Sequence, residues 1–256
     1  MFYSFIVGTA GSGKSLLAAS LEKWLTASDL KVAVVNLDPG VEDPPYTCDV
    51  DIREYVDYAE VMKEYSLGPN GALVASLDMA VSYANELRTE IVDAGAQYVL
   101  VDCPGQMELF AYRNSGPLMV TTLKGEEPAL SIYLLDSNIA HTPTGYLASM
   151  LLGVSISIRF GLPQLNVLSK QDILKEDQIQ EIVDWSTDSY LLEEALDSSE
   201  SGLLREYSGS ILRMLEDFGG GTSVIPVSAK QMSGLEILYG EMQRIFAGGE
   251  DYVADW

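Results

Sequence analysis

Short apolar runs alternate along this chain with segments in which apolar residues recur at helical spacing. The apolar runs predict strands at residues 2–7, 31–37, 98–101, 129–135, 164–168 and 223–227. The helical periodicity predicts helices at residues 15–27, 71–94, 144–158 and 233–246. Strands and helices in alternation predict an α/β fold, a doubly wound and mostly parallel sheet with helices on both faces. Ligands of such sheets bind beyond the carboxyl ends of the strands.

A long acidic stretch of helical pattern, residues 172–219, precedes the last predicted strand. We interpret it as a helical insertion with solvated faces, inside one domain that covers residues 1–256. A chain of 256 residues with 47% hydrophobic content can bury one large core, and no separate linker is visible.

The chain is strongly acidic, since 38 Asp and Glu residues against 15 Lys and Arg residues give a net charge of −23. This charge repels nucleic acid and anionic membranes, so direct contact with either is not expected. The longest apolar stretch, residues 146–158, is shorter than the roughly 18 residues needed to span a bilayer. Two cysteines and an N-terminus without a basic region predict a cytoplasmic protein. Because the net charge is negative, any anion that the chain binds needs a local positive site.

Such a site follows the first predicted strand, where the segment GTAGSGKS at residues 8–15 matches GxxxxGK[ST] at every fixed position. Glycines let the backbone approach a polyphosphate closely and point its N–H groups at the phosphates. A helix that begins near Lys14 adds the positive end of its dipole. The alternative is a glycine-rich turn that binds nothing. The phosphate ligands predicted on this loop are Gly8, Gly11, Ser12, Gly13, Lys14 and Ser15.

Two side chains of the loop carry the charge and the metal chemistry. Lys14 supplies a positive charge for the β- and γ-phosphates, and the Ser15 hydroxyl can ligate Mg²⁺. The segment VLVDCPGQMEL places Asp102 at the end of the third predicted strand, where P-loop proteins hold a carboxylate for the Mg²⁺ shell. Mg²⁺ is therefore the predicted cofactor.

Four residues are predicted to act at the γ-phosphate. Gly105 would let its N–H approach that phosphate, and Gln106 and Glu108 are candidates to orient or activate the attacking water. Asp38, in NLDPG after the second predicted strand, is a candidate general base or a partner of Mg²⁺-bound water. An ordinary Pro-Gly turn and a plain turn carboxylate are the alternative interpretations. The sequence does not separate Asp38 from Glu108 as the base.

Base recognition is predicted after the last two strands. In SKQD, Asp172 can accept hydrogen bonds from guanine N1–H and the exocyclic amine, a donor pair that adenine lacks. The stem of Lys170 can lie over the base, and Ser169 begins the motif where an asparagine would offer more side-chain bonding. In SAK, the backbone N–H groups of Ser228 and Ala229 are expected to meet guanine O6. Together the two motifs predict that GTP and GDP bind in preference to ATP.

A further segment, Gly68-Pro69-Asn70-Gly71, has the composition of a turn. Together with DPG after the second strand, DVDIREYV at residues 49–56, DCPGQMEL and SKQD, it makes the chain resemble the GPN-loop GTPases of archaea and eukaryotes over nearly its whole length. The resemblance implies a P-loop NTPase fold with helical insertions and hydrolysis of GTP to GDP and phosphate.

The same resemblance implies a homodimer. In it, Gly68, Pro69 and Asn70 would enter the active site of the partner, and Asn70 would reach the γ-phosphate region in trans. Eukaryotic members are linked with the assembly of RNA polymerases, which makes that complex a candidate protein partner. The catalytic residues of the family would fall on Asp38, Asp102, Gln106 and Glu108.

Two rival functions stay open at this point. One is a P-loop ATPase or small-molecule kinase, although the insertion offers only Arg205 and Arg213 as basic lid residues. The other is a scaffold or assembly chaperone that hydrolyses GTP very slowly and acts by holding its partners. Arg53 is also open, since it could lie near the nucleotide, lie at the dimer contact or form a salt bridge.

Overall fold

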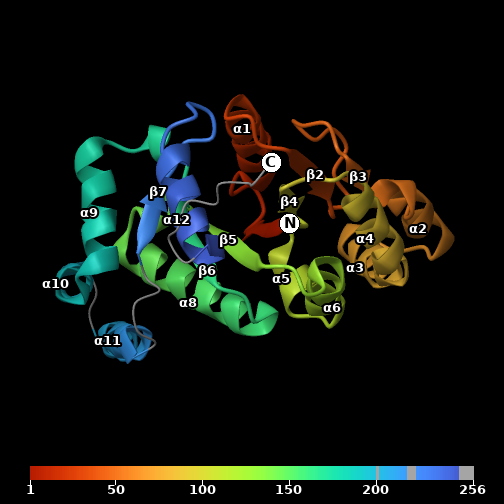
Figure 1. Cartoon of the computed structure of the whole chain (residues 1–256). Coiled ribbons are helices and arrows are strands. Elements are labelled where there is room, and N and C mark those ends of the chain that lie inside the picture. Colours follow the sequence, from red (N-terminus) through yellow and green to blue (C-terminus); the bar gives the residue numbers. More distant parts are fainter. Residues whose placement is uncertain (200–201, 218–222, 248–256) are drawn as a thin grey trace.

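A seven-stranded, fully parallel sheet runs through the middle of the protein (Figure 1). The computed structural model describes residues 1–199, 202–217 and 223–247. Its strands follow the order β3-β2-β4-β1-β5-β6-β7 across the sheet. Their bounds are β1 (Phe2–Gly8), β2 (Val32–Asn36), β3 (Val50–Asp51), β4 (Tyr98–Asp102), β5 (Ala129–Asp136), β6 (Gln164–Ser169) and β7 (Val224–Pro226).

The central strand β1 is buried on both faces because apolar side chains alternate between two cores. Tyr3 and Phe5 belong to one hydrophobic cluster, while Phe2 and Ile6 belong to the other. Continuous apolar runs of this kind are typical of parallel strands that helices cover on both sides. The doubly wound α/β architecture predicted from the sequence is therefore confirmed.

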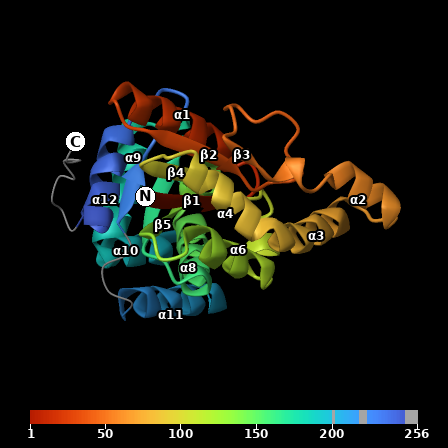
Figure 2. The same cartoon turned by 45° about the vertical axis from the view of Figure 1, so that its right-hand side comes forward.

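Two helices cover one face of the sheet, namely α1 (Lys14–Ala27) and α12 (Leu235–Ala247). Figure 2 shows α1 and α8 on opposite sides of the strands. The cluster on the second face contains residues of α2 (Tyr58–Glu64), α3 (Pro69–Ala80), α4 (Ala84–Asp93), α5 (Met107–Ala111), α6 (Ser115–Lys124), α7 (Ser137–Ala140), α8 (Pro143–Phe160), α9 (Glu176–Thr187), α10 (Ser189–Ser199) and α11 (Leu203–Asp217). Short 3₁₀ turns are η1 (Ile52–Glu54), η2 (Val81–Tyr83) and η3 (Gln171–Ile173).

The six predicted strands are present, whereas the short edge strand β3 was missed. The single helix predicted at residues 71–94 is wrong, because the 3₁₀ turn η2 separates α3 from α4 and Tyr83 leaves helical geometry with φ −104° and ψ 8°. The turn predicted at residues 68–71 is wrong as well. There, Gly68 caps α3 and Pro69 occupies its first position, where a missing N–H removes no helical hydrogen bond.

The acidic segment at residues 172–219 contains α9, α10 and α11. Its positions 200–201 and 218–219 lie outside the described residues. In Figure 1 these helices lie at the opposite end of the sheet from α2 and α3. Within the described part of the chain, no helix has both the length and the apolar character needed to cross a membrane.

Candidate nucleotide-binding site

The loop between β1 and α1 has the shape that phosphate binding requires. It connects Gly8 at the end of β1 to Lys14 at the start of α1. Gly13, immediately before the helix, has φ 99°, a left-handed conformation that residues with a Cβ atom rarely adopt. This conformation turns the chain directly from the loop into α1, so the free N–H groups of the first helical turn face the space above the loop.

Lys14 is held by carbonyl groups of its own loop. The side chain is 5% exposed, and its Nζ donates to Gly8 O at 3.0 Å and to Thr9 O at 2.9 Å. Burial lowers the pKa of Lys14, and the nearby Asp102 carboxylate opposes that effect. The ammonium therefore sits over the phosphate loop, where a phosphate oxygen could replace the two carbonyl acceptors.

Asp102 meets the requirements of a magnesium carboxylate. It ends β4 directly beside Ile6 of β1, and its Oδ2 accepts a hydrogen bond from Tyr46 Oη at 2.7 Å. Its Oδ1 is buried and has no hydrogen-bond partner among the described residues. Burial raises the pKa of Asp102, and the Ser15 hydroxyl lies close enough to work against that rise. A buried carboxylate oxygen without a partner, next to a hydroxyl, fits a divalent cation.

Such a cation would take only part of its coordination shell from the protein. No group of three or more His, Cys, Asp or Glu side chains that could hold a metal occurs in the described ranges. Mg²⁺ usually keeps several waters and binds through one or two protein groups together with substrate phosphates. Ser15 and Asp102 would supply two protein ligands, which agrees with this mode of Mg²⁺ binding.

A second cluster of predicted residues lines a pocket of about 250 Å³ beside the phosphate loop, which we call the γ-phosphate pocket. Asp38, Asn70, Gly105 and Gln106 lie together on its wall. Gly105 N–H does not point freely into this space, since it donates to Asp38 Oδ2 at 2.9 Å. Asp38 Oδ1 accepts from Gly40 N at 2.9 Å. A γ-phosphate that used the Gly105 N–H would therefore have to displace Asp38 from it.

Glu108 does not join these residues. It lies on the first turn of α5 with an exposed side chain and is not part of the pocket wall. Its negative charge nevertheless reaches Lys14 and contributes to raising the pKa of that ammonium. Of the two carboxylates that sequence reasoning left open as the base, Asp38 is the one that borders the γ-phosphate pocket.

The predicted base-reading residues surround a pocket of about 270 Å³, the base pocket, at the ends of β6 and β7. Its wall includes Ser169, Lys170, Asp172 and Ala229, beside apolar side chains such as Ile173. Asp172 Oδ1 accepts a hydrogen bond from the Ser228 hydroxyl at 2.5 Å. The carboxylate is thus oriented before any base arrives.

Ser228 differs from the sequence-based expectation. Its backbone N–H donates to Ser233 O at 3.0 Å, so it does not face the base pocket. The role of Ser228 is corrected from backbone donor to side-chain partner of Asp172, and Ala229 alone of the two lines the pocket. The β-bridge between Ser228 and Ser233 is the physical reason.

Lys170 lies between the base pocket and the phosphate loop. It adopts φ 59°, and its Nζ donates to Asp136 Oδ2 at 2.8 Å. Its Cε lies 4.0 Å from where a Cβ on Gly13 would be. This places the aliphatic stem of Lys170 along the pocket, as expected for a side chain that covers a base.

A hydrogen bond joins helix α1, which follows the phosphate loop, to the loop after β7 that lines the base pocket. Ser20, a buried residue on the second turn of α1, donates from its hydroxyl to Ala229 O at 2.8 Å. The helix that begins at the phosphate loop is thereby bound to the loop that lines the base pocket.

Several named proteins are similar in sequence to this chain over most of its length. A GPN-loop GTPase 1 of Dictyostelium discoideum is 31% identical over 96% of this chain. The GPN-loop GTPase PAB0955 of Pyrococcus abyssi is 34% identical, over 91% of this chain and 92% of that protein. Its crystal structure, a GTPase in apo form, is similar with a TM-score of 0.83 at 31% identity and covers 96% of this chain and 97% of that one.

The chain belongs to the GPN-loop GTPase family. A family model described as a conserved hypothetical ATP binding protein also matches residues 6–248. The chain spans 61% of the length of the D. discoideum GPN-loop GTPase 1 and 60% of that of Schizosaccharomyces pombe. The resemblance drawn from the sequence motifs is confirmed by these matches.

The GPN loop, Gly68-Pro69-Asn70, forms the N-terminus of α3. The Tyr58 hydroxyl donates to Pro69 O at 3.1 Å and so ties α2 to the loop. Asn70 borders the γ-phosphate pocket of its own chain, opposite residues that follow β2 and β4. The family's namesake segment therefore lies beside the γ-phosphate pocket of its own chain, whereas the resemblance implies that Asn70 acts on the site of the partner.

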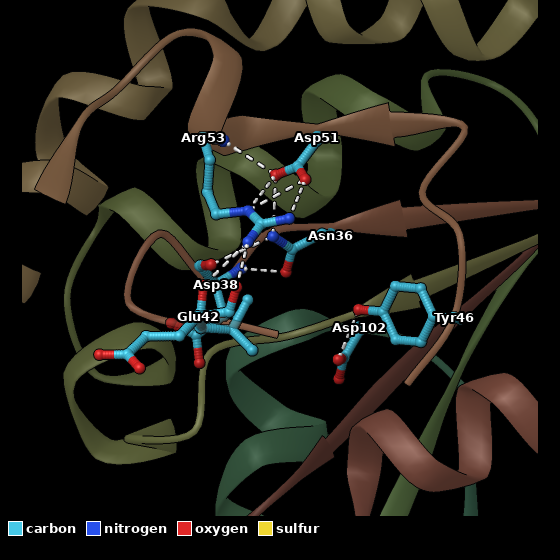
Figure 3. A network of polar contacts seen from close by, with 8 residues as sticks. Asn36, Asp38, Glu42, Tyr46, Asp51, Arg53 and Asp102 are labelled. Atoms are coloured by element: carbon cyan, nitrogen blue, oxygen red, sulfur yellow. Dashed lines mark hydrogen bonds and ion pairs between the residues drawn. The ribbon is translucent and has the colours of Figure 1, made fainter. Parts of the chain in front are cut away.

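Arg53 forms a salt bridge, which was one of its three expected roles. Its guanidinium binds Asp51 with Nη2 to Oδ2 at 2.6 Å, and Nη1 donates to Val41 O and Glu42 O at 3.0 Å each. Sequence reasoning missed three polar residues of this region, Asn36, Tyr46 and Asp51 (Figure 3). The available signal for Asn36 was a polar residue at the end of an otherwise apolar strand.

Proposed function

We propose that this chain binds GTP with Mg²⁺ and hydrolyses it to GDP and phosphate. The observation that carries the proposal is the pairing of a phosphate loop, formed by Gly8 to Ser15, with a base pocket in which Asp172 is already oriented by Ser228. Family membership supports the same reaction, because the named relatives are GTPases.

Each residue contributes a distinct part of the reaction. Lys14 and the loop N–H groups, from Gly8, Gly11 and Gly13 onward, stabilise the charge that develops on the transferred phosphoryl group, while Ser12 N–H donates to Thr9 O at 3.1 Å and shapes the loop. Ser15 and Asp102 would hold Mg²⁺, which would neutralise phosphate charge when bound. Lys170, Asp172 and Ala229 bind the guanine.

Water activation falls to the γ-phosphate pocket. Asp38 and Gln106 border it, so we assign them to the attacking water, with Asp38 accepting its proton and Gln106 orienting it. Glu108 acts from a greater distance, through its charge on Lys14. Gly105 offers its N–H to the γ-phosphate once Asp38 has moved from it.

The test of nucleotide identity uses the parent protein. Calorimetric titration with non-hydrolysable GTP and ATP analogues in the presence of Mg²⁺ should show guanine preference of at least several tens-fold, because adenine leaves Asp172 without its donor pair. Release of phosphate from GTP is measured in parallel. Equal binding of both nucleotides would instead favour an ATPase or kinase, and the matching family model is described as an ATP binding protein.

We further propose, from the family resemblance, that two copies form a cytoplasmic homodimer in which Asn70 completes the partner's site and GTP turnover changes the shape of the dimer. In this role the protein acts as a switch in the assembly of a larger complex such as RNA polymerase. A slow-hydrolysing scaffold is the rival. Solution scattering of the GDP and GTP-analogue forms separates the two, since a scaffold that merely holds partners needs no difference in shape.

The trans role of Asn70 is tested by mixing two inactive variants. Lys14→Ala lacks a working site but offers Asn70, whereas Asn70→Ala retains the site but lacks the donor. If Asn70 acts in trans, the mixture should regain about one quarter of the parent turnover, since half of randomly formed dimers are mixed and each holds one complete site. If Asn70 serves its own chain, the mixture should stay as inactive as its components.

A further inference from the structure

The backbone of Asp38 is held on both sides by one buried side-chain amide (Figure 3). Asn36 ends β2 and is 0% exposed. Its Oδ1 accepts a hydrogen bond from Asp38 N at 3.0 Å, and its Nδ2 donates to Asp38 O at 3.2 Å. Both peptide groups of the proposed catalytic carboxylate are therefore tied to the same side chain.

The amide of Asn36 is itself fixed from the neighbouring strand. Asn36 and Asp51 face each other in the register of β2 and β3, and Asn36 Nδ2 also donates to Asp51 Oδ1 at 2.9 Å. Because both Asp51 and Asp38 O accept from Nδ2, the orientation of the amide is determined by its surroundings. Asn36 thus has one arrangement that satisfies all its hydrogen bonds.

An ion pair keeps Asp51 available as an acceptor. Arg53 Nε lies 3.0 Å from each oxygen of Asp51, and Nη2 lies 2.6 Å from Oδ2. Burial would raise the pKa of Asp51, but the hydrogen bonds from Arg53 and Asn36 outweigh it and lower the pKa to about 2. The carboxylate is ionised at neutral pH and accepts from Asn36 without competing as a donor.

The same guanidinium binds the loop that follows Asp38. Nη1 donates to Val41 O and Glu42 O at 3.0 Å each, while Gly40 N donates to the Asp38 carboxylate at 2.9 Å. Asn36 and Arg53 therefore fix the chain at Asp38 and just beyond it. The Asp38 side chain is directed by backbone N–H groups, with Oδ1 accepting from Gly40 N and Oδ2 accepting from Gly105 N at the γ-phosphate pocket.

We propose that Asn36 is a positioning residue for GTP hydrolysis, which holds the backbone of Asp38 so that its carboxylate reaches the attacking water. The inference rests on the proposed function of Asp38. A purely structural amide that joins two strands would need only Asp51 as its partner. The two additional hydrogen bonds to Asp38 are what link Asn36 to the chemistry.

A double-mutant cycle on turnover tests the proposal. Single-turnover phosphate release is measured for the parent, Asn36→Ala, Asp38→Ala and the double variant. Loss of a general base costs about 100-fold or more, so Asp38→Ala should fall by that amount. Asn36→Ala should fall about tenfold or more, with GTP-analogue affinity within about twofold of the parent, and the double variant should equal Asp38→Ala.

Asn166→Ala provides the matched control. Asn166 is a similarly buried asparagine of the same sheet, on β6, and is separated from β2 by three strands. Its loss should lower the melting temperature as Asn36→Ala does, while turnover stays within about twofold of the parent. If Asn36→Ala fails to fold, Asn36→Ser replaces it in the cycle, because serine retains one short donor and acceptor.

The outcomes separate the inference from the function on which it rests. If Asn36→Ala lowers turnover by the same factor with and without Asp38, or leaves turnover unchanged, Asn36 does not act through Asp38 and the inference is overturned while the role of Asp38 stands. If Asp38→Ala alone leaves turnover unchanged, the assignment of Asp38 fails, and the positioning role of Asn36 fails with it.

Discussion

The two ends of the nucleotide site differ in what their polar groups bind before a nucleotide arrives. At the base pocket, Asp172 is held by Ser228 and Lys170 by Asp136, and neither pairing blocks the space that a base would fill. At the γ-phosphate pocket, the Lys14 ammonium and the Gly105 N–H are paired with loop carbonyls and with Asp38.

This difference assigns separate tasks to the two ends. A base can enter with little change in hydrogen bonding, since the groups that read it already stand in place. Under the proposed function, a terminal phosphate would have to exchange with acceptors of the protein itself, so we expect its arrival or departure to change the loops that carry Asp38 and Gly105. The proposed function thus assigns recognition of the base to one end of the site and the response to the number of phosphates to the other.

Lys14→Ala should have the largest effect, because it removes the main positive charge at the phosphate end of the site. Loss of the ammonium should weaken both GTP-analogue and GDP binding by about 100-fold or more, because charge-assisted hydrogen bonds to phosphate are lost. Calorimetric titration measures this. Lys124→Ala, on α6 with its Nζ on Gly125 O, is the control and should bind as the parent does. Unchanged affinity of Lys14→Ala would contradict the phosphate-loop assignment.

Asp172→Asn should break the base end while leaving the phosphate end intact. Mismatched hydrogen bonds cost about 1–3 kcal/mol, so the preference for guanine over adenine nucleotides should fall about tenfold or more. The reason is that a carboxamide offers one acceptor in place of two. Xanthine carries an oxygen where guanine carries its amine, so a xanthosine nucleotide should bind this variant better than the parent. A guanine preference that survives in Asp172→Asn would show that the base is read elsewhere.

Asp38→Ala should sharpen the comparison by freeing the Gly105 N–H. If Asp38 competes with the γ-phosphate for that donor, the ratio of GTP-analogue to GDP affinity should rise by about two- to tenfold, the worth of one hydrogen bond. Turnover should fall in the same variant. The two affinities are measured by competition titration, and a ratio equal to that of the parent would mean that the bond between Asp38 and Gly105 does not oppose phosphate binding.

The smallest effect concerns the stability of the clamp around Asp38. Asp51 has a pKa lowered from its ordinary 3.8 to about 2. Asp51 therefore binds a proton more readily in the unfolded chain than in the folded one. Its ionised carboxylate stabilises the fold above pH 3.8, and this stabilisation is lost as the pH falls toward about 2. Relative to Asp51→Asn, the parent should lose its advantage in urea unfolding over that window. A constant difference across the window would contradict the ion pair with Arg53.

Much of the fold was predictable because each main strand is a run of buried apolar residues. The strand β3 was not predicted, because it consists only of Val50 and Asp51, and Asp51 carries a carboxylate. The GPN segment has the composition of a turn but begins a helix, because Gly and Pro are common at the first positions of helices as well as in turns. The break at η2 falls on Val81, Ser82 and Tyr83, which include neither glycine nor proline to mark the end of a helix.

The motifs gave the residues of the site, but the bonds between them depend on the folded chain. The hydrogen bond from Tyr46 to Asp102 joins positions 56 residues apart. A local sequence pattern cannot predict it. Ser228 was predicted from its backbone, whereas a bridge to Ser233 occupies the N–H and leaves the hydroxyl to orient Asp172. Motif spacing identifies which elements meet, while the direction of each donor is decided by its neighbours in the sheet.

The hydrogen bond from Ser20 to Ala229 has a consequence for the pace of the reaction cycle. It joins the helix behind the phosphate loop to the loop that lines the base pocket, so the nucleoside and its first two phosphates would lie against one connected unit. Neither Ser20 nor Ala229 lines the γ-phosphate pocket, so we expect this bond to persist when the terminal phosphate is cleaved. We therefore expect GDP to remain bound after hydrolysis, so that product departure, and not bond cleavage, limits how often each molecule can turn over.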